Sequence, residues 1–94
     1  MNGDINGAFE KRDPKEAFKW LEAASKNGHP QAMGTLGSLY NRGDGVDQDN
    51  QKAFYWIQKA AQKGDVDSMF FLGSFFYEGQ GTEQSLEKAV HWYA

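Results

Sequence analysis

His29 and His91 are the two side chains best suited to act as a general base or metal ligand near neutral pH. Catalysis would also need a nucleophile, a partner in proton transfer or a metal cluster. The two histidines lie far apart in the sequence and supply no such set. We expect His29 to help start a helix before Pro30 and His91 to lie on the surface, so we predict no catalytic residue and no enzymatic activity.

The acidic loop of Asp44, Asp47 and Asp49 invites comparison with a calcium site. An EF-hand loop needs a glycine at its sixth position and a glutamate that closes the loop. When Asp47 is taken as the first ligand, Lys52 stands at the glycine position and no glutamate follows at the required spacing. We therefore predict no bound metal.

Two Gly-x-Gly pairs, at 43–45 and 79–81, could be taken for loops that bind a dinucleotide. Such a loop follows a strand and carries a third glycine. The third glycine is replaced by Gln48 and Gln84, and each pair is expected to follow a helix. We predict turns at these glycines, and no cofactor.

The elements that would position these residues recur along the chain. Trp20, Trp56 and Trp92 are spaced 36 residues apart. Further residues recur at the same period: Met33 and Met69, Leu36 and Leu72, Gly37 and Gly73, Gly28 and Gly64, and Lys52 and Lys88. A period of this size indicates a solenoid, in which each unit buries its apolar face against the next.

The period predicts the organisation of the chain. We expect a single repeat domain over residues 1–94, with a partial repeat at 1–28, a full repeat at 29–64 and a nearly full repeat at 65–94. Both ends break the period, which suggests a fragment of a longer array. Truncated ends would expose apolar residues such as Trp92 and Tyr93, and this surface could drive self-association.

Each repeat should contain two antiparallel helices. Asp13 is a candidate N-cap, with Glu16 completing a capping box, and Gly28 is placed to end the helix that follows. The same design recurs from Asp49 to Gly64, and Ser85 should cap a third copy. The expected buried positions follow helical spacing: Ala17, Trp20, Leu21 and Ala24 in the first copy, and Ala53, Trp56, Ile57 and Ala60 in the second.

A second kind of helix is predicted between these copies, over residues 30–42. Its apolar stripe and that of the next repeat share one pattern: Met33, Leu36, Gly37 and Tyr40, then Met69, Leu72, Gly73 and Phe76. The glycine of each stripe removes a side chain where a neighbouring helix must come close, and tryptophans opposed to Tyr40 or Phe76 should fill the space beside it. We therefore predict an all-α fold, an α/α superhelical solenoid of antiparallel helix pairs.

The segments that carry the pattern, at 36–46 (LGSLYNRGDGV), 52–56 (KAFYW) and 59–64 (KAAQKG), resemble the Sel-1-like repeat, a relative of the tetratricopeptide repeat. The resemblance covers nearly all of residues 29–94, and 13–28 match its second helix. It implies a right-handed superhelix with a concave face lined by the first helices, and a role as an adaptor or scaffold. The absence of cysteine rules out the disulfide-bonded branch of the family.

Composition narrows the kind of partner. The formal net charge of −3 and the lack of a Lys/Arg cluster argue against nucleic acid. No apolar run approaches the ~18 residues of a membrane span, and the first residues lack the features of a signal peptide, so we expect no membrane insertion. The compartment stays open. We expect a protein or peptide ligand.

Helical phase indicates where that ligand would bind. Gly34 and its counterpart Phe70 are among the positions expected to point away from the buried stripes. The candidate partner-binding residues on this surface are Gln31, Ser38, Asn41, Arg42, Phe70, Ser74, Tyr77 and Glu78. Two explanations of Phe70 and Tyr77 stay open, because exposed aromatics can anchor a partner or cover the site of a missing repeat. Arg42 and Glu78 could hold a charged ligand or, as the simpler expectation, pair with each other.

The sequence therefore favours an interaction module that binds a peptide or protein segment on the concave surface of the first helices. The alternative is a purely architectural role, as a spacer or self-association module. Mutation of the concave aromatics would then change stability or self-association rather than the binding of a partner.

Overall fold

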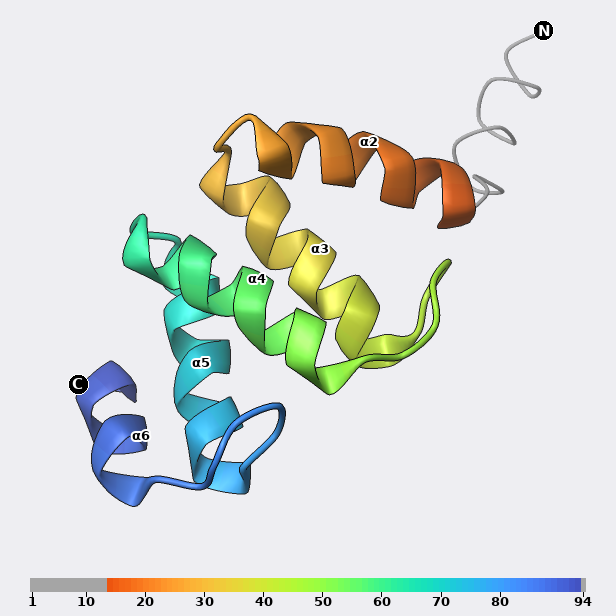
Figure 1. Cartoon of the computed structure of the whole chain (residues 1–94). Helices are drawn as coiled ribbons and strands as arrows, with labels where there is room; N and C mark the ends of the chain where they lie inside the picture. The colour runs from red at the N-terminus through yellow and green to blue at the C-terminus, as the bar shows by residue number, and fades with distance from the viewer. Residues whose placement is uncertain (1–13, 94) are drawn as a thin grey trace, which may run out of the picture.

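The computed structural model describes residues 14–93, and these residues form five α-helices and no strand. The helices are α2 (Pro14–Lys26), α3 (Pro30–Arg42), α4 (Asn50–Gln62), α5 (Val66–Glu78) and α6 (Leu86–Tyr93). Each helix packs against the next one along the chain, which gives a zigzag stack (Figure 1). The predicted all-α solenoid of antiparallel helix pairs is confirmed.

Side-chain caps start α4 and α6. Asp49 accepts hydrogen bonds from the backbone N–H groups of Gln51 and Lys52, both at 3.0 Å, and so caps α4. Ser85 Oγ accepts from the N–H of Lys88 at 3.2 Å, as its predicted capping role requires. The predicted cap at Asp13 lies outside the described residues. His29 precedes Pro30 as the N-cap residue of α3 but makes no side-chain capping bond.

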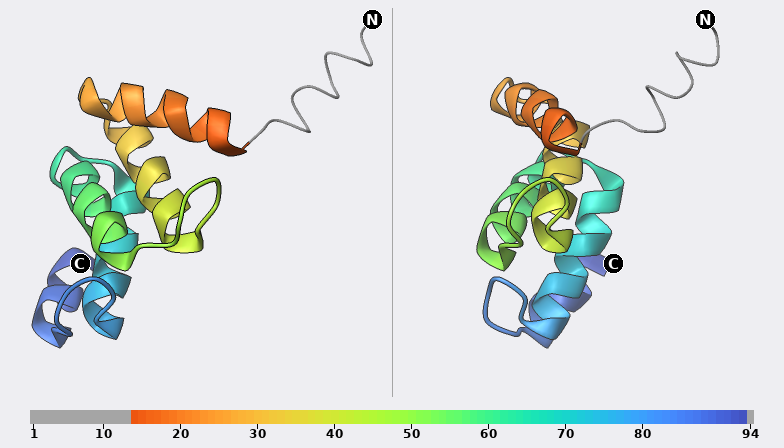
Figure 2. Two further views of the ribbon diagram at one scale, coloured as in Figure 1. Left: turned by 45° about the vertical axis from the view of Figure 1, so that its right-hand side comes forward. Right: turned by 90° about the vertical axis from the view of Figure 1, so that its right-hand side faces the viewer.

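Glycines end the first helix of each pair. Gly43 and Gly79 adopt φ values of 70° and 74°, and their backbone N–H groups donate to carbonyls in the last turns of α3 and α5. This left-handed conformation costs little only when there is no Cβ. The loops that follow each lead into the next helix of the stack, as Figure 2 shows from two further sides.

The core lies between the helix pairs. Leu36, Ile57 and Leu72 are fully buried, and they belong to one cluster with the remaining core residues. These are Tyr40, Ala53, Ala61, Phe75, Phe76 and Ala89. The stripes predicted for residues 30–42 and 66–78 therefore face the core, although Met69 is only half-buried.

The predicted burial of Trp20 is wrong, because this side chain is 73% exposed. Ala17, Leu21 and Ala24, on the same stripe, are half-buried. Trp56 occupies the equivalent position one repeat later and packs against the core cluster. The part of the chain that the structure describes has no helix before α2 that could cover Trp20 in this way.

The aromatic pairs beside the stripes also differ from the expectation. Phe18, rather than Trp20, packs edge-to-face on Tyr40, with ring centroids 5.5 Å apart. Phe54 packs on Phe76 at the same separation. The large rings that fill this space are therefore Phe18 and Phe54, two residues before Trp20 and Trp56.

Candidate functional site

A groove runs between α3 and the first half of α5. We call it the α3/α5 groove, and its volume is about 230 Å³. Its lining residues are Gln31, Gly34, Thr35, Ser38 and Arg42 on α3, with Asp65, Asp67, Ser68 and Phe71 on or next to α5. The α3 residues follow helical spacing, so one face of α3 forms one wall of the groove.

Gly34 forms the floor of this groove where the two helices touch. A Cβ added to Gly34 would lie 2.8 Å from Asp65 Oδ2 and still closer to Ser68 Oγ. Gly34 is buried, so the expectation that this position points outward is wrong. The position belongs to the contact between successive repeats, and glycine fits there because the side chains of Asp65 and Ser68 come so close to its backbone.

Asp65 and Ser68 are held in place by each other. Ser68 Oγ donates to Asp65 Oδ2 at 2.5 Å, and the backbone N–H of Ser68 donates to the same oxygen at 3.2 Å. Asp65 therefore caps α5 and stays fixed beside Gly34. The carboxylate of Asp67 makes no hydrogen bond or ion pair with another described residue and is exposed.

A second hollow adjoins the groove on α5. We call it the Phe70 hollow, and it has a volume of about 310 Å³ with four lining residues, Asp67, Phe70, Phe71 and Ser74. Asp67 and Phe71 line both hollows, which makes the surface continuous. The Phe70 and Phe71 side chains are 66% and 47% exposed. The Phe70 ring also packs against Tyr93, with centroids 5.5 Å apart.

The structure brings together part of the predicted site. Gln31, Ser38 and Arg42 line the α3/α5 groove, while Phe70 and Ser74 line the Phe70 hollow. Asn41, Tyr77 and Glu78 line neither of these two hollows. The Ser74 hydroxyl lies 2.9 Å from the Tyr93 hydroxyl and is hydrogen-bonded to it, so Ser74 is engaged by α6.

The expected ion pair between Arg42 and Glu78 is wrong. Arg42 Nη2 lies 3.8 Å from Asp44 Oδ2, and both side chains are well exposed. Asp44 is two residues along the chain and reaches Arg42 from the loop after α3. Within residues 14–93, Glu78 has no ion pair.

Sequence reasoning left Thr35, Asp67 and Phe71 out of the candidate site. Helical spacing could have identified them, because residues three or four apart lie on the same face of a helix. Thr35 is three residues before Ser38, and Phe71 is three residues before Ser74. A step of four back from Phe71 leads to Asp67. The expectation for Phe70 was right, since it is 66% exposed, whereas Gly34 at the equivalent position is buried.

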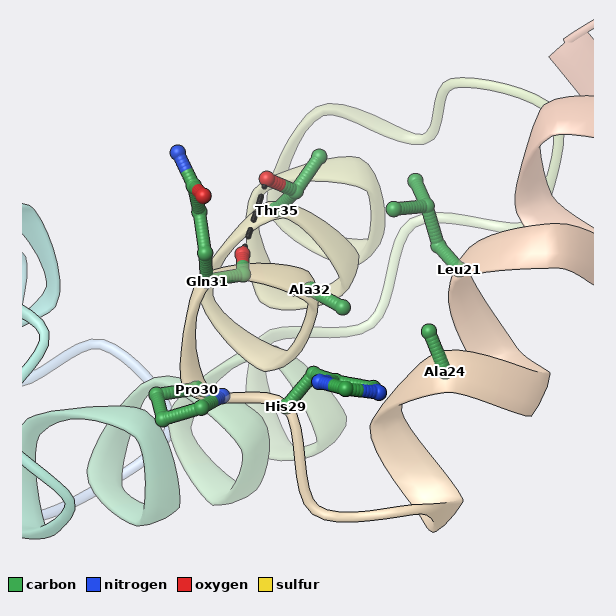
Figure 3. A pocket seen from close by; sticks show the side chains of 7 residues that line it. All are labelled: Leu21, Ala24, His29, Pro30, Gln31, Ala32 and Thr35. Carbon is green, nitrogen blue, oxygen red and sulfur yellow. Dashed lines mark hydrogen bonds between the residues drawn. The ribbon is translucent and has the colours of Figure 1, made fainter.

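A further hollow, of about 530 Å³, lies between α2 and α3 (Figure 3). Leu21 and Ala24 of α2 face residues from the start of α3, and the Thr35 hydroxyl donates to the Gln31 carbonyl at 3.0 Å. One repeat later, the residues equivalent to Leu21 and Ala24 are Ile57 and Ala60, which are buried. This hollow is therefore a stacking surface of the repeat rather than a shaped ligand pocket.

The histidines and the acidic loop have other roles. His91 is exposed and packs edge-to-face on Trp92, and His29 lines the hollow between α2 and α3. Asp49 is used as the cap of α4. Over residues 14–93, no group of three or more His, Asp or Glu side chains is placed to hold a metal. No helix in this range has the length and apolar character to cross a bilayer.

Comparison with protein families gives one consistent result. The model of the Sel1 repeat matches residues 3–29, 30–65 and 66–94. The matches cover nearly the whole chain in three consecutive units. No curated protein matches the chain.

The fold is shared with solved structures, including the following three. A Sel1 repeat protein from Oxalobacter formigenes is 37% identical with a TM-score of 0.84, over 88% of this chain and 34% of that protein. The Escherichia coli protein c5321, described as a protective antigen of uropathogenic strains displaying an SLR fold, is 31% identical with a TM-score of 0.88, over 95% of this chain and 19% of that protein. Cysteine rich protein B of Helicobacter pylori is 29% identical with a TM-score of 0.78, over 81% and 57% of the two chains. This chain thus spans about a third, a fifth and somewhat over half of these relatives.

Proposed function

This chain belongs to the Sel1 repeat family, and from that premise we propose that it is an interaction module which binds a peptide or protein segment in the α3/α5 groove and the adjoining Phe70 hollow. Members of the family are generally scaffolds for protein interactions and typically not enzymes. We extend both properties to this chain. The groove lies between the first helices of two repeats, where the resemblance implied a concave binding face.

One observation carries the proposal. Phe71 is 47% exposed at the point where the α3/α5 groove meets the Phe70 hollow, and polar side chains such as Thr35, Ser38 and Asp67 surround it. An aromatic side chain within a polar rim is the usual arrangement of an interface anchor. Removing such a side chain from water on binding is favourable, and the rim supplies hydrogen bonds that orient the ligand.

The charges of the groove disfavour nucleic acid as the ligand. The lining residues include one cation, Arg42, and two carboxylates, those of Asp65 and Asp67. Arg42 is already paired with Asp44. Because nucleic-acid affinity depends on several phosphate contacts by Lys and Arg, we propose a protein or peptide as the partner.

Site-specific photo-crosslinking tests the proposal. A photoreactive phenylalanine analogue is placed at Phe71 and, as a matched control, at Tyr55, which is an aromatic residue of α4 with a similar exposure of 51%. We expect a specific protein from a lysate of the producing cells to be crosslinked through position 71 and not through position 55. Circular dichroism confirms that both variants remain helical.

A second comparison guards against indirect effects. In this comparison the photoreactive analogue is placed at Thr35. Adding Phe71→Ala to that chain should abolish capture of the partner, while adding Tyr55→Ala should leave capture intact. Equal capture through positions 71 and 55, or capture that survives Phe71→Ala, would contradict the proposed site.

The alternative of an architectural or self-associating module has its own structural support. Val66, Val90 and Tyr93 are exposed apolar residues on α5 and α6 that do not line the α3/α5 groove. Sedimentation velocity at increasing protein concentration separates the two roles. Self-association that is removed by Val90→Asp and unaffected by Phe71→Ala would favour the architectural role.

A further inference from the structure

Phe70 stands at the helical position that Gly34 occupies one repeat earlier. At Gly34, the side chains of Asp65 and Ser68 lie directly against the backbone. A Cβ added to Gly34 would already be 2.8 Å from Asp65 Oδ2. A phenyl ring is far larger than a Cβ. The contact that Gly34 makes with an aspartate and a serine would therefore not fit unchanged at Phe70.

The Phe70 ring instead contacts α6. It packs edge-to-face against Tyr93 of α6, with an angle of 74° between the ring planes. It still leaves 66% of its side chain exposed and forms one wall of the Phe70 hollow beside Phe71. Two exposed aromatic side chains therefore line one hollow.

The charge that lines the Phe70 hollow has a single sign. Helix α5 carries two carboxylates, Asp67 and Glu78, and no Lys or Arg. Asp67 is the charged residue among the four that line the Phe70 hollow, and no described side chain neutralises it. Its place in the first turn of α5 is favourable for the helix dipole, but it leaves the carboxylate open to a ligand.

We propose that the Phe70 hollow binds a peptide segment in which a Lys or Arg stands next to an apolar side chain. This inference rests on the proposed function and names the chemistry of the partner. The apolar side chain packs on Phe70 and Phe71, and the cation pairs with Asp67. A cation over an aromatic face is also attracted by the ring quadrupole, so the rings and the carboxylate favour the same ligand.

Selection from a random-peptide phage library tests this chemistry directly. The wild-type chain is immobilised, and the enriched peptides are then synthesised with a fluorescent label, together with variants in which Lys and Arg are replaced by Gln. We expect enriched peptides to carry a basic residue close to an aromatic or aliphatic one. The Gln variants should bind about tenfold more weakly, as expected for the loss of one charged contact at a partly desolvated site.

Variants of the protein show where the peptides bind. We expect Asp67→Asn to weaken binding about tenfold and Phe71→Ala to weaken it at least as much. Asp47→Asn and Tyr55→Ala serve as controls, since they remove an exposed carboxylate and an exposed ring elsewhere, and binding should be unchanged. Rising salt should weaken binding to the wild type more than to Asp67→Asn.

The outcomes separate this inference from the proposed function. Neutral or acidic peptides that lose binding in Phe71→Ala but not in Asp67→Asn would overturn the basic partner and leave the α3/α5 groove as a peptide site. No enrichment over the bare support, or binding indifferent to both substitutions, would overturn the inference and the proposed function together.

Discussion

Gly37 on α3 lies so close to Ile57 on α4 that a Cβ added to Gly37 would stand 2.7 Å from Ile57 Cγ1. The Ala53 carbonyl oxygen would be 3.1 Å away on another side. Ile57 is buried in the core, so its side chain cannot swing out into solvent. The same contact recurs one repeat later between Gly73 and Tyr93, where the Cβ would be 2.8 Å from Tyr93 Cε1.

Gly37→Ala should therefore destabilise the protein, although alanine is normally the better helix former by ~1 kcal/mol. We expect the free energy of unfolding to fall by about 1–3 kcal/mol, because overpacking forces Ile57 or the backbone of α4 to shift. Gly73→Ala should cost less, since the Tyr93 ring is partly exposed and can swing away. Urea unfolding followed by circular dichroism gives both values, and equal losses would contradict this view of the contact.

Two buried serines should respond in opposite directions to alanine. Ser25 and Ser68 are each 1% exposed, but Ser25 Oγ has no hydrogen-bond partner, while Ser68 Oγ donates to Asp65. Ser25→Ala should raise the free energy of unfolding by about 1 kcal/mol, because it removes an unpaired buried hydroxyl. The repeat supports this expectation, since Ala61 stands at the equivalent position and is buried.

Ser68→Ala should lower the same quantity by about 1 kcal/mol, through the loss of a satisfied hydrogen bond. The thermal midpoint of each variant, measured against the wild type, checks the pair. A loss of stability in Ser25→Ala would show that its hydroxyl has a bonding partner in solution.

The fold was largely predictable because the residues that determine the packing recur in each repeat. Glycine recurs at one period at positions 37 and 73, which indicates close helix packing, and at 43 and 79, which indicates turns. The structure uses each glycine in the expected way. Trp20 shows the limit of this reasoning. It has a similar sequence context to Trp56, but burial depends on which helix lies next to it, and the sequence of one repeat does not carry that information.

The candidate site was harder to predict for a related reason. Surface and stacking positions are adjacent on these short helices, so an error of one residue in helical phase exchanges them. Gly34 was assigned to the outer surface but is covered by Asp65 and Ser68, and Phe71 was passed over although it faces the groove. The period alone does not show which of these positions are exposed, because the equivalent residues Gly34 and Phe70 differ between the two repeats.

The N-cap of α4 provides a test with a matched control in the same loop. Asp49 accepts two backbone hydrogen bonds at 3.0 Å, whereas Asp47 is exposed and makes no such bond. Asp49→Ala should lower the free energy of unfolding by about 1 kcal/mol, and Asp47→Ala should change it by less than about 0.5 kcal/mol. Both variants remove one negative charge, so a similar loss in the two would point to overall charge rather than the cap.

Comparison of the ring pairs Phe18–Tyr40 and Phe54–Phe76 indicates which parts of these side chains contribute to stability. Their geometry is nearly the same, with angles of 87° and 84° between ring planes, and a lysine ammonium lies 5.5 Å from the centroid of Tyr40 and of Phe76. Since Phe76 performs this role without a hydroxyl, Tyr40→Phe should alter the free energy of unfolding by less than about 0.5 kcal/mol.

Phe54→Ala should instead cost about 3 kcal/mol, because it removes a ring that packs against the core and leaves Phe76 without its partner. Tyr55→Ala is the control, since it removes a neighbouring ring that is largely outside the core. Urea unfolding of the three variants distinguishes the contributions of ring, hydroxyl and position. A small effect of Phe54→Ala would mean that the contact between α4 and α5 depends on the other core residues, and that the recurring aromatic pair is not part of what stabilises the stack.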